Sequence, residues 1–290
     1  MELGKIKKVT VIGSGLMGTG IAQVCAQSGY DVSLEDVSQA QVARGLDGIM
    51  ESIKKHLVDK GKLSVGEAAE LMSRIKGTTD LKEALEETDI VIEAIHEDMD
   101  LKKALFREAD KIAPSGTVFA SNTSSLLITE IASATGRPER CIGMHWFYPP
   151  AVMKLVEVVR GLLTSEETYN TVIEFANHLG KVPVTVKDSP GFVVVRLLSG
   201  LIADAIRCVE EGLLSVEDLD KACRLGLNHP MGPLELGDYT GLDTYLRIFE
   251  YLYEVTGESR FKPPLLLRKM VASGHFGRKS GKGFYNYLQQ

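Results

Sequence analysis

The apolar positions of the chain follow one pattern up to residue 187 and another beyond it. In the first part, short β-branched and aliphatic runs alternate with stretches in which apolar residues recur at helical spacing. Such runs are typical of buried parallel strands, and such spacing is typical of amphipathic helices. After Asp188-Ser189-Pro190-Gly191 only the helical spacing continues. We therefore predict an α/β domain over residues 1–187 and an all-α domain over residues 188–290.

The first domain is expected to hold a mostly parallel sheet, because strand-like and helix-like segments alternate along it. Two helices in succession exceed the usual single crossover between strands, so this helical insertion, about 39–76, is expected to protrude. The expected strands are 8–12, 32–35, 89–95, 117–120, 141–147, 154–160 and 182–187. The expected helices are 39–60, 64–76, 126–134 and 164–179 in the first domain, then 192–211, 216–225, 234–255 and 264–273 in the second.

A glycine-rich turn directly follows the first predicted strand. Its GxGxxG spacing places one glycine at the tight turn, one where a pyrophosphate can approach the backbone, and one where the helix packs on the strand. The N–H groups at the start of the next helix point at the phosphates, and the helix dipole favours the negative charge. This arrangement predicts a Rossmann-type dinucleotide site. Its expected contacts are Gly13, Gly15, Leu16, Met17 and Gly18.

The second predicted strand ends at an acidic residue, Asp36, which lies 18 residues after Gly18. A carboxylate at this place suits a hydrogen bond to a ribose 2′-hydroxyl, and it would repel a 2′-phosphate. The expected cofactor is therefore NAD and not NADP.

A histidine and a glutamate flank the turn between two predicted strands. If the strands pair antiparallel about a turn centred on Ala151, His145 and Glu157 lie opposite each other, since each is six positions from the centre. Opposite residues share a face of the sheet, with Cβ atoms ~5 Å apart. The carboxylate would then orient the imidazole and stabilise its protonated form, as general base catalysis requires. The alternative is a histidine that ends a strand and an acid on a solvated face.

Composition and charge restrict the other function classes. The chain has 290 residues, of which 44% are apolar and 25% charged, and a formal net charge of −6, which gives no long-range attraction to nucleic acid or an anionic membrane. The chain has no apolar run long enough to span a bilayer, and its first residues lack the pattern of a signal peptide, so neither a membrane span nor a signal peptide is expected. Four scattered cysteines without a CxxC pair predict reduced thiols in the cytoplasm, and no metal site is expected. Apolar stripes in the second domain predict a homodimer interface.

Seven longer segments, in order and spacing, make the chain resemble the 3-hydroxyacyl-CoA dehydrogenases of the short 3-hydroxybutyryl-CoA type. The resemblance covers nearly the whole chain and is far more specific than the glycine motif alone. The segments are GSGLMGTGIAQ, EAIHEDMDLKK, ASNTSSLLITEIA, H-x-F-x-P-x-x-VMKLVEVV, KDSPGFVVVRLL, NHPMGPLELGDYTGLD and FGRKSGKGFYNY.

The resemblance implies an oxidoreductase that interconverts a (3S)-3-hydroxyacyl-CoA and a 3-oxoacyl-CoA with NAD as its cofactor. In such an enzyme the base that takes the proton of the 3-hydroxyl, while hydride passes to NAD, corresponds to His145, and its orienting carboxylate to Glu157. Ser124 corresponds to a serine that hydrogen-bonds the reacting oxygen beside the cofactor. The remaining matched cofactor contacts are Glu97, Lys102 and Lys279.

The helical insertion carries four lysines, Lys54, Lys55, Lys60 and Lys62. From the residues alone they form either a solvated face or a clamp for an anionic part of a substrate. The resemblance favours the clamp, because the corresponding helices hold the CoA. It implies contacts from Ser52 and from a basic residue for which we choose Lys60 over Lys55.

Two positions depart from the pattern of the family. Tyr148 and Val195 stand where the family usually has asparagines close to the reacting substrate and cofactor. Valine cannot donate a hydrogen bond, and tyrosine donates from a longer and bulkier arm. A bulky or cyclic acyl group is therefore one expectation for the substrate. The alternatives left open are a dehydrogenase of a non-CoA hydroxy compound and a non-catalytic NAD-binding protein.

Overall fold

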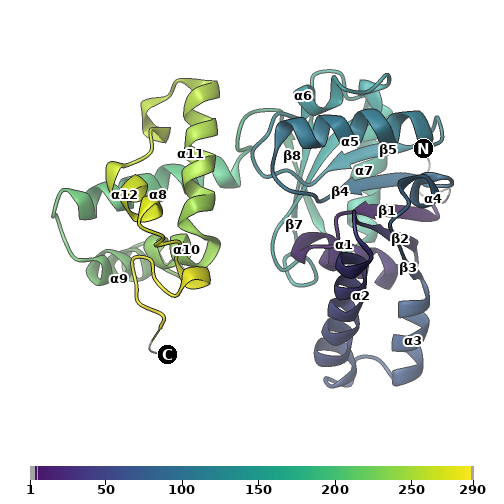
Figure 1. The fold of residues 1–290 in the computed structure, drawn as a ribbon, viewed down its shortest axis with the longest axis horizontal. Helices are drawn as coiled ribbons and strands as arrows, with labels where there is room; N and C mark the ends of the chain where they lie inside the picture. Colours follow the sequence, from purple (N-terminus) through teal and green to yellow (C-terminus); the bar gives the residue numbers. More distant parts are fainter. Residues whose placement is uncertain (1–3, 5, 289–290) are drawn as a thin grey trace. The chain divides into compact units, whose positions relative to one another are not determined.

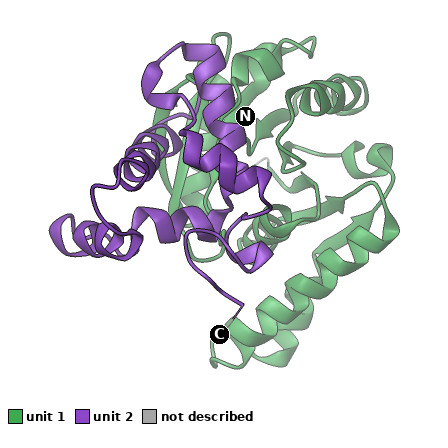
Figure 2. Cartoon of the chain, turned by 60° about the vertical axis from the view of Figure 1, so that its left-hand side comes forward, with its two compact units in different colours: residues 1–189 green, residues 190–290 purple. Residues whose placement is uncertain are grey.

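The computed structural model describes residue 4 and residues 6–288 of the chain. These residues divide into two compact units, Met1–Ser189 and Pro190–Gln290 (Figure 2). Figure 1 shows an α/β architecture in the first unit and helices alone in the second. This is the predicted fold class, a mostly parallel sheet followed by an all-α part.

An eight-stranded sheet forms the centre of the first unit, with the order β3-β2-β1-β4-β5-β6-β7-β8. Every neighbouring pair is parallel except β6 and β7, which are antiparallel. The carboxyl ends of β1, β2, β4 and β5 therefore meet at one edge of the sheet, where ligands of open α/β sheets bind. The strands are β1 (Lys8–Ile12), β2 (Asp31–Glu35), β3 (Ile75–Thr78), β4 (Ile90–Glu93), β5 (Val118–Ser121), β6 (Cys141–Trp146), β7 (Leu155–Arg160) and β8 (Val182–Lys187).

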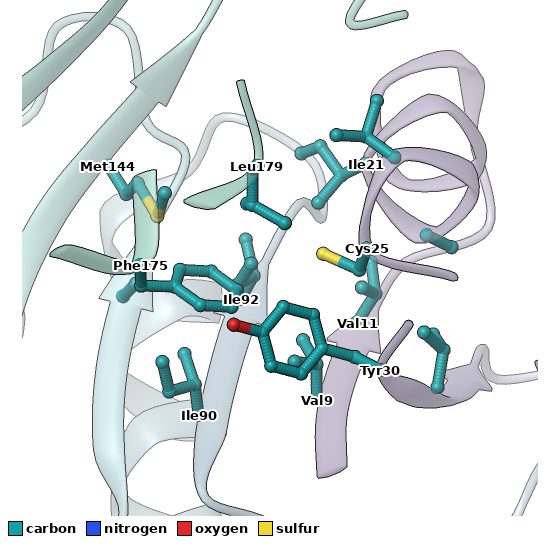
Figure 3. Close-up of a cluster of buried hydrophobic side chains, with 14 of the residues drawn as sticks. Val9, Val11, Ile21, Cys25, Tyr30, Ile90, Ile92, Met144, Phe175 and Leu179 are labelled. Atoms are coloured by element: carbon teal, nitrogen blue, oxygen red, sulfur yellow. The ribbon is translucent and has the colours of Figure 1, made fainter. Parts of the chain in front are cut away.

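Helices cover both faces of this sheet. A large hydrophobic cluster joins α1 and α7 to the strands, and Figure 3 labels ten of its side chains. They are Val9, Val11, Ile21, Cys25, Tyr30, Ile90, Ile92, Met144, Phe175 and Leu179. The helices of the unit are α1 (Leu16–Gln27), α2 (Gln39–Ile53), the π-helical turn η2 (Lys54–Val58), α3 (Val65–Ser73), α4 (Leu81–Leu85), α5 (Met99–Ile112), α6 (Ile128–Ala132), the 3₁₀ turn η3 (Pro138–Arg140) and α7 (Glu166–His178).

The inserted helical pair α2 and α3 extends below the sheet in Figure 1, as the sequence predicted. The predicted helix 64–76 is wrong at its end, because α3 stops at Ser73 and Ile75–Thr78 forms the edge strand β3. A four-residue edge strand with two exposed positions has no apolar run that would reveal it. The strand pairs with β2, and α2 packs closely on it: a Cβ atom on Gly77 would lie 2.4 Å from a methyl group of Val42.

In the described part of the second unit, five helices pack around a core that includes Ile202, Ile206, Leu234, Phe249 and Leu267. The predicted single helix 234–255 is wrong, because Gly241 adopts a φ of 110° and divides it into α10 and α11. Such a φ is costly for residues other than glycine, so the chain turns there. The elements are α8 (Val194–Glu210), α9 (Val216–Gly226), α10 (Pro233–Thr240), α11 (Leu242–Thr256), the 3₁₀ turn η4 (Ser259–Phe261), α12 (Leu265–Ala272) and the 3₁₀ turn η5 (Arg278–Ser280).

Across the described part of both units, none of the helices combines the length and the apolar character needed to cross a membrane.

Candidate active site

The predicted histidine–glutamate pair is present in the sheet. β6 and β7 pair antiparallel with His145 directly opposite Glu157, which confirms the register expected from the sequence. The Nδ1 atom of His145 lies 2.7 Å from Oε2 of Glu157. Both side chains are buried, with exposed fractions of 4% for His145 and 1% for Glu157. A neutral imidazole that donates from Nδ1 to the carboxylate has Nε2 as its basic nitrogen, so the pair can act as an oriented base.

The aromatic ring of Phe147 packs against the imidazole, with 4.5 Å between the ring centroids. This contact and the hydrogen bond to Glu157 restrict the rotation of His145 from two sides. An imidazole with a restricted orientation loses little freedom when it meets a substrate.

The turn after β5 carries Ser124 at the same edge of the sheet. Asn122 links this turn to β6, because its Oδ1 accepts a hydrogen bond of 2.9 Å from the backbone N–H of Trp146, the residue after His145. Glu97 holds the turn from the other side: its Oε1 accepts hydrogen bonds from the Thr123 hydroxyl at 2.6 Å and the Ser124 N–H at 2.8 Å. The half-buried Ser124 is thereby fixed beside the strand that carries the histidine.

A buried ionic network stabilises Glu97 in this position. The Lys102 ammonium lies 2.6 Å from Glu93 and 3.3 Å from Glu97, and Ser121 donates its hydroxyl to Glu93. Desolvation acts to raise the pKa of Glu97, but the charge of Lys102 and the hydrogen bonds outweigh it and hold that pKa below its usual value. The exposed fraction of the Lys102 side chain is 1%. Lys102 therefore acts on the site through the carboxylates, and a direct contact of Lys102 or Glu97 with a cofactor stays a prediction.

The glycine turn has the geometry that a dinucleotide requires. Gly13 has a φ of 101°, and a Cβ atom there would lie 2.6 Å from the carbonyl oxygen of Ala94. A Cβ atom on Gly18 would lie 1.7 Å from the carbonyl oxygen of Gly13, so helix and turn touch directly. Gly15, the N-cap of α1, has no atom within 4 Å of the position that a Cβ would take. The chain's own atoms therefore leave room for a pyrophosphate at the N-terminus of α1, where Leu16 and Met17 begin the helix.

Asp36 lies beside this turn and is oriented by the chain itself. Its Oδ2 accepts hydrogen bonds from the N–H and the hydroxyl of Ser14, and its Oδ1 accepts one from the N–H of Val37. Asp36, Ser14 and Gly15 line a hollow of about 370 Å³, which Gln41 and Arg44 line from α2. The residues present thus fit an NAD whose adenosine ribose meets the carboxylate of Asp36.

A second hollow, of about 650 Å³, lies between α1, the inserted helices and the loop after β6. Its polar side includes Ser52 and Lys60, the predicted CoA contacts, together with His56 and Lys62. Tyr148 lines the opposite side of the same hollow. The π-helical turn η2, a rare element that is frequent at functional sites, provides His56.

The two remaining predicted residues belong to the second unit. Val195 is the second residue of α8 and is half-buried. Lys279 lies in η5, and its Nζ atom is 2.6 Å from Oδ1 of Asp243. Their parts in the site stay predictions.

Three residues that hold parts of the site in place through hydrogen bonds were not predicted from the sequence. They are Ser14, Glu93 and Asn122. Glu93 could have been recognised from the sequence, because it is a charged residue inside the apolar run DIVIEAI. A charge in such a run requires a buried partner, which here is Lys102.

Comparisons with known proteins agree over nearly the whole chain. The NAD binding domain of 3-hydroxyacyl-CoA dehydrogenase matches residues 8–189, and the C-terminal domain of that family matches residues 191–287. A probable 3-hydroxybutyryl-CoA dehydrogenase of Bacillus subtilis is 48% identical over 286 residues, which cover 99% of each chain. The human mitochondrial hydroxyacyl-coenzyme A dehydrogenase is 46% identical over 287 residues, covering 97% of this chain and 91% of the human one.

The solved structure of (S)-3-hydroxybutyryl-CoA dehydrogenase PaaH1 from Ralstonia eutropha superposes with a TM-score of 0.94 at 46% identity, covering 98% of this chain and 99% of that one. These similarities favour acyl-CoA chemistry over a non-CoA substrate or a non-catalytic role. The chain is a member of the 3-hydroxyacyl-CoA dehydrogenase family and an NAD-dependent oxidoreductase.

Proposed function

We propose that the protein oxidises a (3S)-3-hydroxyacyl-CoA to the 3-oxoacyl-CoA, and catalyses the reverse reduction, with His145 as the base and Glu157 as its orienting partner. The observation that carries this assignment is the buried contact of 2.7 Å between His145 Nδ1 and Glu157 Oε2. It lies in the same unit as the glycine turn and at the strand edge where Ser124 is held.

In this proposal each of the three site residues has a separate role in the oxidation. Nε2 of His145 accepts the proton of the 3-hydroxyl, and the imidazolium that forms is stabilised by the carboxylate of Glu157. The hydroxyl of Ser124 donates to the oxygen that becomes the carbonyl, which orients the substrate. When bound, NAD supplies the hydride acceptor.

We propose that the cofactor is held by the glycine turn and by Asp36. The N–H groups of Leu16 and Met17, at the start of α1, would donate hydrogen bonds to the pyrophosphate. The carboxylate of Asp36 would accept a hydrogen bond from the ribose 2′-hydroxyl. Glu97 and Lys102 act at the nicotinamide side through the turn that they hold, and Lys279 is assigned to the cofactor by family resemblance alone.

The CoA part of the substrate is assigned to the second hollow. Its mixed apolar and polar lining suits a pantetheine chain, and Lys60 with Lys62 supplies positive charge for phosphate groups. Ser52 is the assigned hydroxyl contact. The relatives from Bacillus subtilis and Ralstonia eutropha are named for 3-hydroxybutyryl-CoA, which supports a short acyl group as the first substrate to test.

The test follows NADH absorbance with a panel of 3-hydroxyacyl-CoA thioesters and the matching free acids. Turnover of a thioester, with no turnover of its free acid, is the expected result. Turnover of free acids alone, or of no member of the panel, would overturn the assignment.

We propose further that the protein is a cytoplasmic homodimer whose subunits meet through the second unit. In this proposal residues 1–187 bind NAD, and residues 188–290 serve dimerisation and substrate binding. Several large apolar side chains of that unit are exposed, and the four cysteines are free. The exposed side chains include Leu197, Leu213, Leu225, Leu227 and Leu265, with exposed fractions between 57% and 79%. Light scattering at micromolar concentration should give the mass of a dimer, and a monomer would refute this part.

A further inference from the structure

The loop between β6 and β7 forms one wall of the hollow assigned to CoA. Residues 148–152 of this loop line the hollow, opposite Ser52 and Lys60. Within the loop, the carbonyl of Pro149 accepts hydrogen bonds from the N–H groups of Val152 and Met153, both at 3.0 Å. The loop also directly follows the strand that carries His145, so its position bears on both the hollow and the base.

A buried lysine from another strand holds this loop. Lys181, the residue before β8, donates from its ammonium to the carbonyls of Pro150 and Met153, the latter at 2.9 Å. Its exposed fraction is 8%, and among the described residues no carboxylate lies within ion-pair distance of Nζ. A buried ammonium is costly unless hydrogen bonds replace its hydration. The carbonyls of Pro150 and Met153 accept hydrogen bonds in place of water, so the position of the loop depends on that of Lys181.

The ammonium also lies over the ring of Trp146, at 5.3 Å from the centroid. Burial lowers the pKa of Lys181, which fits an ammonium that depends on carbonyls and an aromatic face for its stabilisation.

The loop contacts α1 directly on its other side. A Cβ atom on Gly20 would lie 2.7 Å from Cδ of Pro150, so the backbone of α1 and the proline ring are already in contact. Gly20 and Pro150 both line the hollow. The width of the hollow is therefore set by how the loop is held between α1 and Lys181.

We propose that Lys181 is a positioning residue for the CoA thioester, which fixes the wall formed by residues 148–152 and thereby sets the affinity of the hollow. The proposal rests on the proposed function in one respect, namely that this hollow receives the CoA part of the substrate. Lys181 itself does not line the hollow, so it acts through the loop.

The chain contains its own reporter for this contact. Trp146 is the single tryptophan, it is 2% exposed, and the ammonium of Lys181 lies over its ring. Tryptophan emission therefore reports whether the ammonium and the loop keep their places, independently of turnover.

The experiment compares Lys181→Met and Lys181→Arg with the wild type, in the full chain and with free CoA as the probe. Lys181→Met should weaken CoA binding and raise KM for the thioester about tenfold or more, the size expected for lost hydrogen bonds to a charged group, while kcat and the Kd of NAD stay within about threefold. Lys181→Arg keeps the positive charge and the N–H donors, so its affinity for CoA should lie between those of Lys181→Met and the wild type. Lys187→Met, at the exposed far end of β8, is the matched control and should change none of these values.

Gly20→Ala provides a second variant if Lys181→Met fails to fold. The added methyl group pushes on Pro150 from the opposite side and should raise KM for the thioester in the same way. Unchanged CoA affinity in folded Lys181→Met or in Gly20→Ala, or a loss confined to kcat or to NAD binding, would overturn the proposal. If the wild type binds CoA but turns over no thioester, the proposed function fails, while the binding comparison still decides the role of Lys181.

Discussion

The carboxylate of Asp36 accepts hydrogen bonds from both the backbone N–H and the hydroxyl of Ser14, with both distances at 2.7 Å. Ser14 lies within the glycine turn, between Gly13 and Gly15. The acid proposed to select the ribose is therefore oriented by the turn proposed to receive the pyrophosphate, and direct contacts join these two parts of the proposed cofactor site.

This arrangement predicts that NAD binds more tightly than NADP and that Asp36→Ala reduces the difference by about 10- to 100-fold, because a charged hydrogen bond and a repulsion of the 2′-phosphate are lost together. Equilibrium binding of both dinucleotides measures this. Asp31→Ala, at the exposed start of β2, the strand that Asp36 directly follows, is the control. A wild type that prefers NADP, or an unchanged ratio in Asp36→Ala, would contradict the role of Asp36.

Glu35, the neighbour of Asp36, should make stability depend on pH. Burial, with smaller effects from the charges of Asp36 and Glu108, raises the pKa of Glu35 to about 7 from an ordinary value of 4.5. The folded protein therefore favours the protonated form of this carboxyl group. The resulting stabilisation is fully present below pH 4.5, and it is lost as the pH rises from 4.5 to about 7. Glu35→Gln should therefore stabilise the protein at pH 8 by on the order of 1–3 kcal/mol, but not at pH 4. Denaturant titrations at both pH values test this, and an equal effect at both would contradict it.

Lys102 should be far more important to stability than its neighbour Lys103. Lys102→Met leaves the carboxylates of Glu93 and Glu97 without their buried counter-charge, which should cost about 3–5 kcal/mol. Lys103 pairs with Glu130 at the surface, so Lys103→Met should change the free energy of unfolding by less than about 1 kcal/mol. Thermal and denaturant unfolding of the two variants provide the comparison. Similar losses for both lysines would show that the network around Glu93 does not stabilise the fold.

How far the sequence predicts the site depends on which contacts are local. The pairing of His145 with Glu157 could be predicted, because one short turn fixes the register of two adjacent strands. The close contact of Gly18 with the carbonyl oxygen of Gly13 follows in the same way from the strand–turn–helix spacing. Each of these depends on residues close together in the sequence.

The contacts that escaped prediction join distant segments. Nothing near Lys181 in the sequence indicates that it reaches the carbonyls of Pro150 and Met153, about 30 residues earlier. The edge strand β3 was missed because its neighbour β2, and not its own pattern, recruits it to the sheet. Side chains that hold a loop or an edge strand in this way have no periodicity of their own, so only the tertiary structure reveals them.

The dyad should behave as one unit in catalysis. His145→Ala and Glu157→Gln should each lower kcat, with a loss of ~10²–10⁴ for removal of the base and little change in NAD affinity. Because Glu157 acts only through His145, the double variant should lose far less than the product of the two single losses. Steady-state NADH production at saturating substrate measures all three, with Glu174→Gln on the exposed face of α7 as the control. Losses that multiply would mean that the two side chains act separately.

Tyr148 and Val195 should influence which acyl group the enzyme accepts. Tyr148 is 49% exposed and lines the hollow assigned to CoA, and family resemblance places Val195 near the reacting substrate. If the two residues shape the acyl pocket, Val195→Asn should shift kcat/KM toward short straight-chain thioesters without changing the pH profile, because the histidine–glutamate pair is untouched. Comparison of Tyr148→Asn with Tyr148→Phe separates the bulk of the ring from its hydroxyl: a gain for bulky thioesters with Asn alone indicates steric selection, and a loss with Phe alone indicates a hydrogen bond from the phenol. An unchanged substrate profile in all three variants would show that neither residue selects the acyl group.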